Sequence, residues 1–330
     1  MNFIDLFSGI GGFRLGMERN GHVCKGFCEI DKFARQTYTA NFNTENEQFW
    51  EDITTVTDKE IEEFGKRNNI EIICGGFPCQ AFSIAGKRLG FNEKRGTMFF
   101  EIMRFARILK PKYLFLENVK GLLNHENGEA FRTILATLDE LGYDAEWQVL
   151  NSKDFGVPQN RERVFIVGHL RGERTRQIFP LERTGGQNPR ELKVLIAGKH
   201  QGYSVYDVNG ISTTLTSQTG GLGGKTGLYA SFIDLTKGNG KLTNLARCIK
   251  ARYNAGVTNR GADNSGVIEN GRIRKLTPLE CFRLQGFPDE FYYKAKQAGV
   301  SDSQLYKQAG NSVTVNVIEA IACNFEEVKK

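Results

Sequence analysis

The chain has 330 residues, enough for one large domain and a smaller one, and its composition is ordinary for a globular protein, with 40% hydrophobic and 25% charged residues. No run approaches the roughly 18 consecutive apolar residues of a membrane span. The segment MNFIDLFSG lacks the basic and apolar regions of a secretory signal. We therefore expect a cytoplasmic protein that makes no contact with a membrane.

The net charge of +6 comes from one part of the chain. Residues 184–275 hold 13 Lys and Arg against 5 Asp and Glu. This balance is typical of contact with a polyanion, although a solvated basic surface would look the same. The seven cysteines are scattered and the four histidines are not suitably spaced with them, which argues against a disulfide framework and a structural zinc site. We expect no metal.

Predicted strands and helices alternate through the first half of the chain. Helices are predicted between the strands, among them 97–110 and 127–141, and the strands cover residues 3–7, 22–29, 71–76, 112–117, 145–150 and 163–170. This order predicts an α/β fold with a doubly wound, mostly parallel sheet.

After Pro180 the chain becomes rich in Gly, Thr, Ser and Asn, which predicts a second, smaller domain of mainly β and loop structure. A helical pattern returns at about residue 276, and NSVTVNVIEAIACNF is predicted to form a helix buried against the large domain. The predicted division is 1–183 plus 308–330 for the large domain, 184–272 for the small domain and 273–307 for a connecting segment.

Three glycines follow the first predicted strand in D-L-F-S-G-I-G-G-F. Gly9, Gly11 and Gly12 allow a tight turn that approaches a ligand closely, at a helix start that offers N–H groups. The spacing differs from the dinucleotide pattern G-x-G-x-x-G. Glu29, after the second strand, is placed to accept from a ribose diol, and Asp52 to accept from an adenine amino group. A bare glycine turn is the alternative, but the two acids favour an adenosyl cofactor.

Cys79 follows the strand EIICGG in the segment G-G-F-P-C-Q. A buried cysteine is more often a small hydrophobic residue than a nucleophile. Ligands of open α/β sheets bind beyond the carboxyl ends of the strands, however, and Cys79 lies just past one, which favours catalysis. The stretch 80–96 carries Gly, Lys and Arg and is predicted to be a mobile lid that touches phosphates.

Two further segments place charged groups at the same edge of the predicted sheet. Glu117 ends the strand KYLFLE, where partial desolvation would raise the pKa of its carboxyl and let it donate a proton. A capping or salt-bridged carboxylate is the alternative. Arg161 and Arg163 in Q-N-R-E-R-V-F precede another strand, and one of them could point into the cleft, although most such pairs are surface charges.

A cysteine, an acid, an arginine and an adenosyl pocket fit methylation of cytosine at C5. The C5 carbon is a poor nucleophile until a thiolate adds to C6 and an acid engages N3, after which C5 can attack a sulfonium methyl group. Free cysteine, with a pKa of about 8.5, is mostly thiol at neutral pH, so nearby positive charge should help to activate it.

The chain resembles the bacterial and phage DNA (cytosine-5)-methyltransferases over nearly its whole length. The resemblance rests on motifs in the order of the family: DLFSGIGGFRLG, EIDKFA, EDIT, GGFPCQAFS, RGTMFFE, ENVKG, QNRERVF, RKLTPLECFRLQGFP and QAGNSV. It implies a Rossmann-like S-adenosylmethionine-dependent methyltransferase fold and an enzyme that flips its target base out of the duplex. Cys79 would be the nucleophile, Glu117 the acid on the base, and Arg163 a base-pocket residue supported by Arg161.

The resemblance also implies binding residues for the cofactor and for DNA. The S-adenosylmethionine set is Phe7, Ser8, Gly9, Ile10, Gly11, Gly12, Glu29, Ile30, Asp52, Ile53, Pro78, Met98, Asn311 and Val313. The DNA set, in which Gln and Arg side chains can read base edges, is Ser83, Lys87, Arg95, Gln201, Thr214, Arg247 and Arg252. The small domain would be a target-recognition domain. Residues 211–229 and 246–256 both look like recognition segments, and the sequence does not decide between them.

Two other functions stay open. One is a tRNA cytosine-5 methyltransferase of the same fold, and the other is a catalytically inactive DNA-binding regulator. The basic Gly-rich domain and the FSIAG after Cys79 favour DNA, and the intact Cys79, Glu117 and two arginines favour an enzyme; a small-molecule methyltransferase would leave the basic domain unexplained. We expect a monomer that acts on double-stranded DNA in a restriction-modification or phage self-protection system, with a possible cognate restriction endonuclease encoded elsewhere.

Overall fold

The chain folds into two compact units. The computed structural model describes residues 1–78, 98–181, 194–197, 204–206, 232–234, 241–243, 246–249, 265–269 and 272–325. Unit 1 consists of Met1–Leu150, Glu162–Glu182 and Val317–Lys330, and unit 2 of Asn151–Arg161 and Arg183–Asn316. The chain therefore passes between the units four times. The predicted division into a large domain, a small domain and a connecting segment was a division by function, and it stays a prediction.

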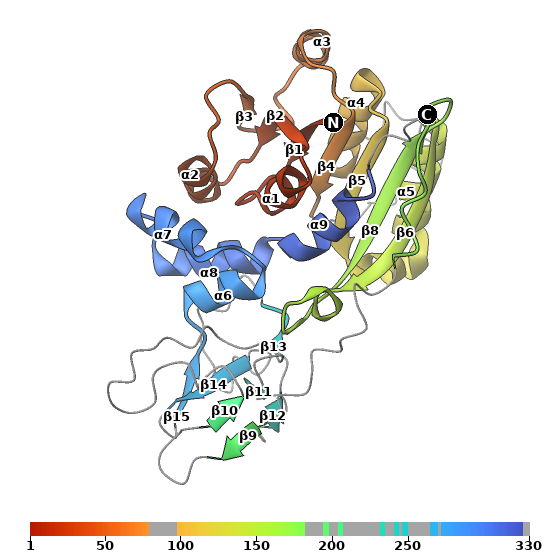
Figure 1. Ribbon diagram of the computed structural model, residues 1–330. Coiled ribbons are helices and arrows are strands. Elements are labelled where there is room, and N and C mark those ends of the chain that lie inside the picture. The colour runs from red at the N-terminus through yellow and green to blue at the C-terminus, as the bar shows by residue number, and fades with distance from the viewer. Residues whose placement is uncertain are drawn as a thin grey trace. The chain divides into compact units, whose positions relative to one another are not determined.

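Unit 1 is built on a seven-stranded sheet in the order β3-β2-β1-β4-β5-β8-β6 (Figure 1). Neighbouring strands from β3 to β5 run parallel, and β8 runs antiparallel to β5. The predicted α/β fold with a doubly wound, mostly parallel sheet is confirmed. The strands are β1 (Asn2–Leu6), β2 (Val23–Cys28), β3 (Gln48–Trp50), β4 (Ile72–Gly76), β5 (Tyr113–Val119), β6 (Tyr143–Asn151) and β8 (Glu162–Leu170).

Helices cover both faces of this sheet, with α1 and α9 on one face and α4 and α5 on the other (Figure 1). The helices in chain order are α1 (Gly12–Arg19), α2 (Lys32–Asn41), α3 (Asp58–Arg67), α4 (Met98–Leu109), the 3-10 helix η1 (Lys120–Gly128), α5 (Glu129–Glu140) and α9 (Val315–Ala322). In the part of the chain that the structure describes, none of the helices is long and apolar enough to span a membrane.

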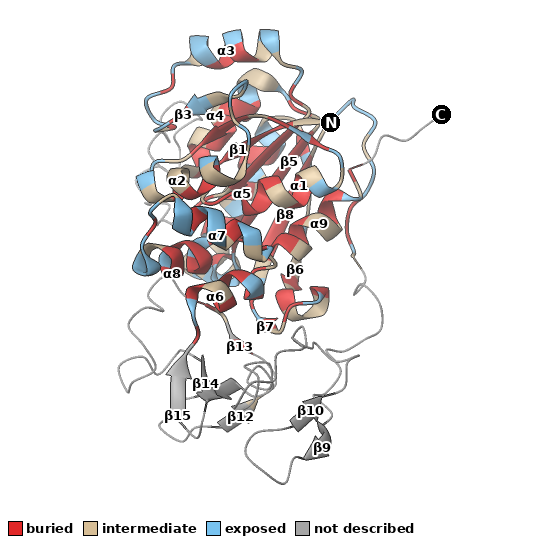
Figure 2. Ribbon diagram, turned by 60° about the vertical axis from the view of Figure 1, so that its left-hand side comes forward, coloured by how far each residue is buried: buried red, intermediate tan, exposed pale blue. Residues whose placement is uncertain are grey.

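Alternate residues of the central strands pack on opposite faces, as the period of two requires. Ile4, Leu6 and Leu114 belong to the cluster that packs with α3, α4 and α5. On the other face, Phe115 meets the ring edge of Phe13 from α1 at a centroid distance of 4.9 Å. The edge strand β6 is partly exposed, whereas the central strands β1, β4, β5 and β8 are buried along most of their length (Figure 2). Because both faces are covered, these strands are continuously apolar in sequence.

Local sequence signals set several helix starts. Asp31 accepts hydrogen bonds from two N–H groups at the start of α2. Thr57 forms a capping box with Glu60 at the start of α3, and Thr277 forms one with Glu280. Each of these side chains satisfies N–H groups that have no partner within the helix.

Unit 2 combines small sheets with helices. A four-stranded sheet has the order β12-β11-β14-β15, and two-stranded sheets pair β9 with β10 and β7 with β13. Its strands are β7 (Gln159–Asn160), β9 (Val194–Ala197), β10 (Ser204–Tyr206), β11 (Phe232–Asp234), β12 (Lys241–Thr243), β13 (Ala246–Arg247), β14 (Ser265–Glu269) and β15 (Arg272–Lys275). Its helices are η2 (Ser152–Phe155), α6 (Pro278–Leu284), α7 (Asp289–Gln297) and α8 (Asp302–Asn311).

The helix predicted over NSVTVNVIEAIACNF is wrong in its first residues. α8 ends at Asn311, and α9 begins only at Val315. Between them, the Thr314 hydroxyl donates a 2.9 Å bond to Gln285 Oε1, and the Val315 N–H donates to the Gln285 carbonyl. Side-chain and long-range hydrogen bonds of this kind replace the helical pattern.

Candidate active site

The turn between β1 and α1 has the left-handed backbone that glycine permits. The φ angle is 55° at Gly9 and 87° at Gly11. A Cβ atom at Gly11 would also lie 2.3 Å from Cε2 of Phe42. Phe7 takes a φ of 57°, an uncommon value for a bulky residue. The spacing of the glycines is therefore required by the turn and by its packing.

Glu29 ties this turn to the end of β2. Its Oε2 accepts a 2.7 Å hydrogen bond from the Gly9 N–H, and its Oε1 accepts a 2.8 Å bond from the Asp31 N–H. Burial raises the pKa of Glu29 above its ordinary value, although the two N–H groups act against the rise. The neighbouring Ile30 is 65% exposed. A carboxylate beside a glycine turn, with an apolar side chain in the open, suits an adenosyl group.

Asp52 lies two residues after β3. Its Oδ1 accepts from the N–H of Thr54 at 2.9 Å and from the hydroxyl of Thr54 at 2.8 Å. The side chain of Ile53 is buried beside it. Because β2 and β3 are parallel neighbours, Asp52 and Glu29 follow strands that end at the same edge of the sheet.

Two buried polar groups near the turn were not predicted from the sequence. Asp5 is fully buried, and neither of its carboxyl oxygens has a hydrogen-bond partner among the described residues; the same holds for the Ser8 hydroxyl. Burial raises the pKa of Asp5 to about 8. The signal in the sequence was its place inside the apolar run FIDLF, where a parallel strand is buried on both faces.

Asn118 holds the end of β4, the strand that leads to Cys79. Its Nδ2 donates a 2.9 Å hydrogen bond to the Phe77 carbonyl, and its Oδ1 accepts from the next N–H of the chain at 2.8 Å. The side chain is 2% exposed. Asn118 therefore fixes the backbone two residues before Cys79. Asn118 was not predicted from the sequence, although its place in F-L-E-N-V, beside the predicted acid, was the available signal.

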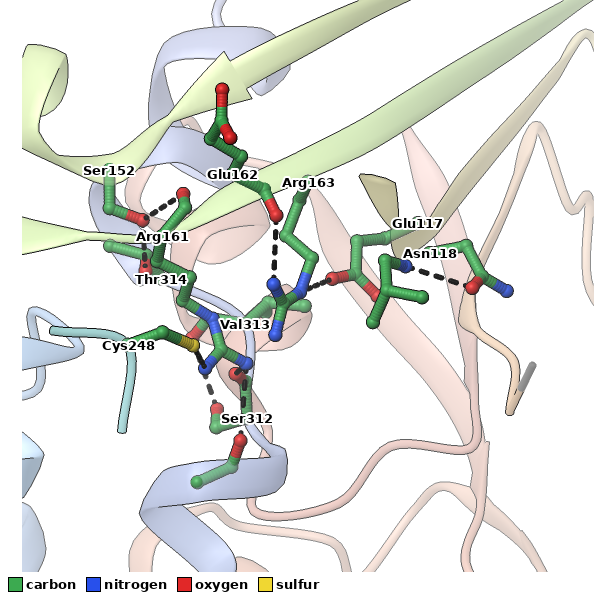
Figure 3. Close-up of polar contacts among 12 residues, drawn as sticks. Glu117, Asn118, Ser152, Arg161, Glu162, Arg163, Cys248, Ser312, Val313 and Thr314 are labelled. Atoms are coloured by element: carbon green, nitrogen blue, oxygen red, sulfur yellow. Dashed lines mark hydrogen bonds and ion pairs between the residues drawn. The ribbon is translucent and has the colours of Figure 1, made fainter. Parts of the chain in front are cut away.

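Glu117 and Arg163 form an ion pair across β5 and β8. Arg163 Nε lies 2.9 Å from Glu117 Oε1, and its Nη1 donates a 2.8 Å bond to the Glu162 carbonyl (Figure 3). Glu117 is 8% exposed. Its register partner on β4 is Gly76, where a Cβ atom would lie 3.3 Å from Glu117 Oε2. Glycine at this position leaves room for the carboxylate, three residues before Cys79. β5 continues to Val119, so Glu117 lies inside the strand that it was predicted to end.

Arg161 belongs to unit 2 and is 2% exposed. Its Nη1 donates to Cys248 Sγ at 3.2 Å and to the Ile249 carbonyl at 3.1 Å. Its Nη2 donates to the carbonyls of Gly310 at 3.2 Å and Ser312 at 2.6 Å (Figure 3). The guanidinium thus connects two segments that lie far apart in the sequence. The predicted support that Arg161 gives to the base-pocket arginine stays a prediction.

The remaining predicted residues are distributed along the chain. Ile10 is buried at the turn, Pro78 is exposed after β4, and Met98 is the first residue of α4. Asn311 ends α8 and Val313 is buried after it, both in unit 2. Outside the described residues lie the stretch 80–96, the segment 211–229, and Cys79, Ser83, Lys87, Arg95, Gln201, Thr214 and Arg252. Of the segment 246–256, only residues 246–249 are described.

Cysteines and acidic residues form no further site in the part of the chain that the structure describes. No disulfide joins the described cysteines to one another. Among the same residues, no three His, Cys, Asp or Glu side chains are grouped so as to hold a metal ion.

Solved structures similar to this chain share its fold. A methyltransferase from Entamoeba histolytica, EhMeth, matches with a TM-score of 0.63 and 22% identity, over 97% of this chain and 96% of that one. The S. pombe Dnmt2 methyltransferase matches with a TM-score of 0.60 and 18% identity, over 97% and 96% of the two chains.

Sequence comparison goes further than the fold. The chain is 35% identical to the type II methyltransferase M.HhaI of Haemophilus parahaemolyticus, over 98% of this chain and 94% of the relative. A family model described as C-5 cytosine-specific DNA methylase matches residues 1–327. With nearly the whole sequence covered by both matches, the chain belongs to the C-5 cytosine-specific DNA methylase family.

Proposed function

We propose that the protein methylates C5 of a cytosine in a short, specific sequence of duplex DNA, with Cys79 as nucleophile and Glu117 and Arg163 as its partners on the base. One observation carries the assignment of residues. The Glu117–Arg163 ion pair, with 2.9 Å between Nε and Oε1, adjoins Gly76 of β4, and β4 leads within three residues to Cys79. The strand order therefore brings an acid and a guanidinium to the end of the strand that precedes the cysteine.

The nucleophile acts on C6 of the base. The Cys79 thiolate forms a bond to C6, and the electron pair of the C5–C6 double bond moves so that C5 becomes nucleophilic. C5 then forms the bond to the methyl carbon, which bound S-adenosylmethionine would supply as its methyl–sulfur bond breaks and S-adenosylhomocysteine leaves. Loss of the C5 proton to a base restores the double bond and breaks the bond between sulfur and C6, which frees the enzyme. A target inside the stack cannot be reached from both faces, so the base is flipped out.

Glu117 and Arg163 orient the flipped base. The protonated form of Glu117 donates to N3 of the ring, which favours addition of the thiolate at C6 because negative charge then moves toward N3. Arg163 holds the carboxylate of Glu117 in place through Nε, and the Glu162 carbonyl fixes the same guanidinium. A pair that is packed and hydrogen-bonded before the base arrives needs little reorganisation during the reaction.

The cofactor of the family is S-adenosylmethionine, which supplies an electrophilic methyl group when it is bound. We assign its adenosyl part to the turn of Phe7–Gly12. Glu29 would bind the ribose hydroxyls, Ile30 would pack against the adenine ring, and Asp52 would accept from the adenine amino group. The exposed side chain of Ile30 and the carboxylate of Glu29 at the glycine turn support this assignment. The remaining members of the set come from the family resemblance: Ile53, Pro78, Met98, Asn311 and Val313.

We propose duplex DNA as the substrate, and the family resemblance supports the choice of contact residues. We assign DNA contacts to Ser83, Lys87, Arg95, Gln201, Thr214, Arg247 and Arg252. The relatives M.HhaI and M1.ScrFI, the second 40% identical to this chain, are named as type II methyltransferases, and M.SPRI of Bacillus phage SPR as an orphan one. We propose that this chain likewise protects DNA, as a cytoplasmic monomer, with or without a cognate endonuclease.

The test uses methyl-labelled S-adenosylmethionine with duplex DNA, followed by bisulfite sequencing. We expect 5-methylcytosine at one short sequence, and complete loss in Cys79→Ser. Cys323→Ser is the matched control, because Cys323 is exposed at the end of α9 and we expect it to leave the rate unchanged. Label in tRNA instead of DNA would contradict the proposed substrate, and transfer to neither would contradict the proposed activity.

A further inference from the structure

A short segment before β8 is bonded to the start of one of the two predicted recognition segments. β7 pairs in parallel with β13, so that Gln159 lies opposite Ala246. The Ala246 N–H donates a 2.8 Å bond to the Pro158 carbonyl. Ala246 and Ile249 are buried, at 0% and 1% exposure. The start of the segment 246–256 is therefore an anchored, interior part of unit 2.

Gln159 completes this anchor with its side chain, which is fully buried. Its Oε1 accepts a 2.9 Å hydrogen bond from the Ile249 N–H. Its Nε2 donates a 2.7 Å bond to the Leu284 carbonyl at the end of α6. One amide thus connects the recognition segment to a helix. A buried amide with both ends bonded fixes the distance between the segments that it joins.

Arg161 makes the second connection, two residues later. Its guanidinium bonds Cys248 and Ile249 on one side, and Gly310 and Ser312 on the other, at 2.6–3.2 Å. Hydrogen bonds from a charged donor are stronger than neutral ones, and the fork geometry of arginine fixes both directions at once. The segment 246–249 is therefore held at both of its last two residues.

We propose that Gln159 and Arg161 are positioning residues. They couple the position of the recognition segment to the position of Arg163. Only Glu162 separates Arg161 from Arg163 in the chain. Two planar peptide units join them, so only the few backbone torsion angles between Arg161 and Arg163 are able to absorb a displacement of Arg161 before it reaches the backbone of Arg163. Arg163 in turn forms the ion pair with Glu117, in which Nε and Oε1 are 2.9 Å apart. The inference rests on the proposed function, since it gives Arg163 and Glu117 a part in the reaction.

The consequence is a link between sequence recognition and methyl transfer. A duplex that binds Arg247 of β13 correctly would keep Arg161, and hence Arg163, in the aligned position. A duplex with a wrong base pair would be bound but methylated slowly. Arg161 thus contributes to specificity although its own partners are main-chain carbonyls and a thiol.

The test is a double-mutant cycle on the single-turnover rate of methyl transfer, with the duplex in which the wild-type enzyme places 5-methylcytosine. The variants are Arg161→Lys, Arg163→Lys and the double variant. Lysine keeps the charge but loses the fork. We expect Arg161→Lys to slow transfer about tenfold, and the double variant to be no slower than Arg163→Lys alone, because residues that act through one another are not additive. A double variant slowed by the product of the two single effects would overturn the proposal, and so would an unchanged rate in Arg161→Lys.

Discrimination against a mismatch separates positioning from a loss of stability. We expect the ratio of rates on the methylated duplex and on a duplex with one altered base pair to fall severalfold in Arg161→Lys. The matched control is Arg171→Lys, after the other end of β8, where the guanidinium pairs with Asp139 and Asp144 at the surface and the ratio should stay constant. Cys248→Ala, which removes one acceptor of Arg161, should lower the ratio in the same direction. An unchanged ratio in both Arg161→Lys and Cys248→Ala would overturn the proposal.

The outcomes distinguish the two levels of inference. If the wild-type enzyme methylates DNA and the cycle is additive, the link fails while the proposed function stands. If the wild-type enzyme transfers no methyl group, the proposed function itself fails.

Discussion

Arg161 and Arg163 are separated by one residue, yet their surroundings differ in kind. Arg163, at the start of β8, pairs with the carboxylate of Glu117 near the end of β5 in unit 1. Arg161 is enclosed in unit 2 by carbonyl groups and a thiol. The first arrangement pairs two charges that can act on a ligand, and the second uses a charge to hold the chain. The R-E-R pattern therefore contains Arg163, which we propose to act on the base and call the reactive arginine, and Arg161, which holds the chain and which we call the architectural arginine.

The largest expected effect comes from removing the carboxylate of the reactive pair. Glu117→Gln keeps the shape of the side chain but loses its charge and its capacity to engage N3 as an acid. We expect the single-turnover rate of methyl transfer to fall by about 10²–10⁴-fold, the usual contribution of an acid or base in the transition state. The matched control is Glu162→Gln, an exposed residue paired with Lys120, which should change the rate by less than about twofold. Equal rates in the two variants would place the chemistry elsewhere.

Removal of the architectural arginine, Arg161, should act mainly on stability, whereas removal of the Glu117 carboxylate acts mainly on the rate of methyl transfer. Arg161→Met removes the donor to three buried carbonyl groups and to the half-buried Cys248 Sγ, and we expect the free energy of unfolding to fall by about 3 kcal/mol or more. Urea denaturation measures this loss. Arg171→Met, at an exposed ion pair, should cost less than about 1 kcal/mol. A similar small cost in Arg161→Met would mean that its contacts contribute little to folding.

Asn118 is a neutral side chain that we expect to contribute both to the stability of the fold and to the rate of methyl transfer. Asn118→Leu removes the donor to the Phe77 carbonyl, so we expect a loss of about 1–3 kcal/mol in stability and slower methyl transfer, since that carbonyl lies two residues before Cys79. Asn68→Leu removes a similar bond to the Phe64 carbonyl at the end of α3. Both variants are compared by thermal unfolding and by single-turnover rate. A slower rate in Asn68→Leu as well would show that reduced stability alone explains the effect.

Asp5 extends the comparison to a buried acid with no hydrogen-bond partner among the described residues. Its pKa is raised from 3.8 to about 8 by burial. Between these values the folded chain keeps a proton that the unfolded chain releases, so the free energy of unfolding should fall as the pH rises from about 4 to 8. Asp5→Asn should lack this slope and be more stable than the wild type at pH 8 by more than about 1 kcal/mol.

The measurement for Asp5 is urea denaturation at several pH values. Asp144→Asn, an exposed acid, is the matched control and should keep the wild-type slope. If Asp5→Asn retains the wild-type slope, the carboxyl is not protonated in the folded state.

Much of unit 1 could be predicted because its signals are local. The apolar runs of β1, β4 and β5 and the glycines of the first turn are visible in the sequence, and the parallel order follows from alternation with helices. Glu117 was singled out because it lies near the carboxyl end of a parallel strand, where ligands bind. Arg163 lies at the start of β8 and reaches the same edge only because β8 runs antiparallel to β5, which was not predicted from the sequence.

The contacts of Gln159 and Arg161 could not be predicted in this way. They connect residue 159 with 249 and residue 161 with 310, pairings that no local pattern encodes. The burial of Asp5 was missed for a different reason. A single acid in an apolar run is usually predicted to be exposed because it is charged. In a central strand, both faces are covered, and the acid is therefore buried with its neighbours.

The aromatic ring of Phe325 has a consequence for the order in which the protein folds. It packs against Tyr113 and Phe115 on one face of the large sheet, with ring centroids 4.9 Å and 5.3 Å apart. Those strand residues leave the ribosome long before Phe325 does, so during synthesis the part of the face that Phe325 covers stays open to water or to other chains. Phe325 packs there only after residues 183–316 have been made, and a chaperone that covers this apolar surface is most valuable during that interval.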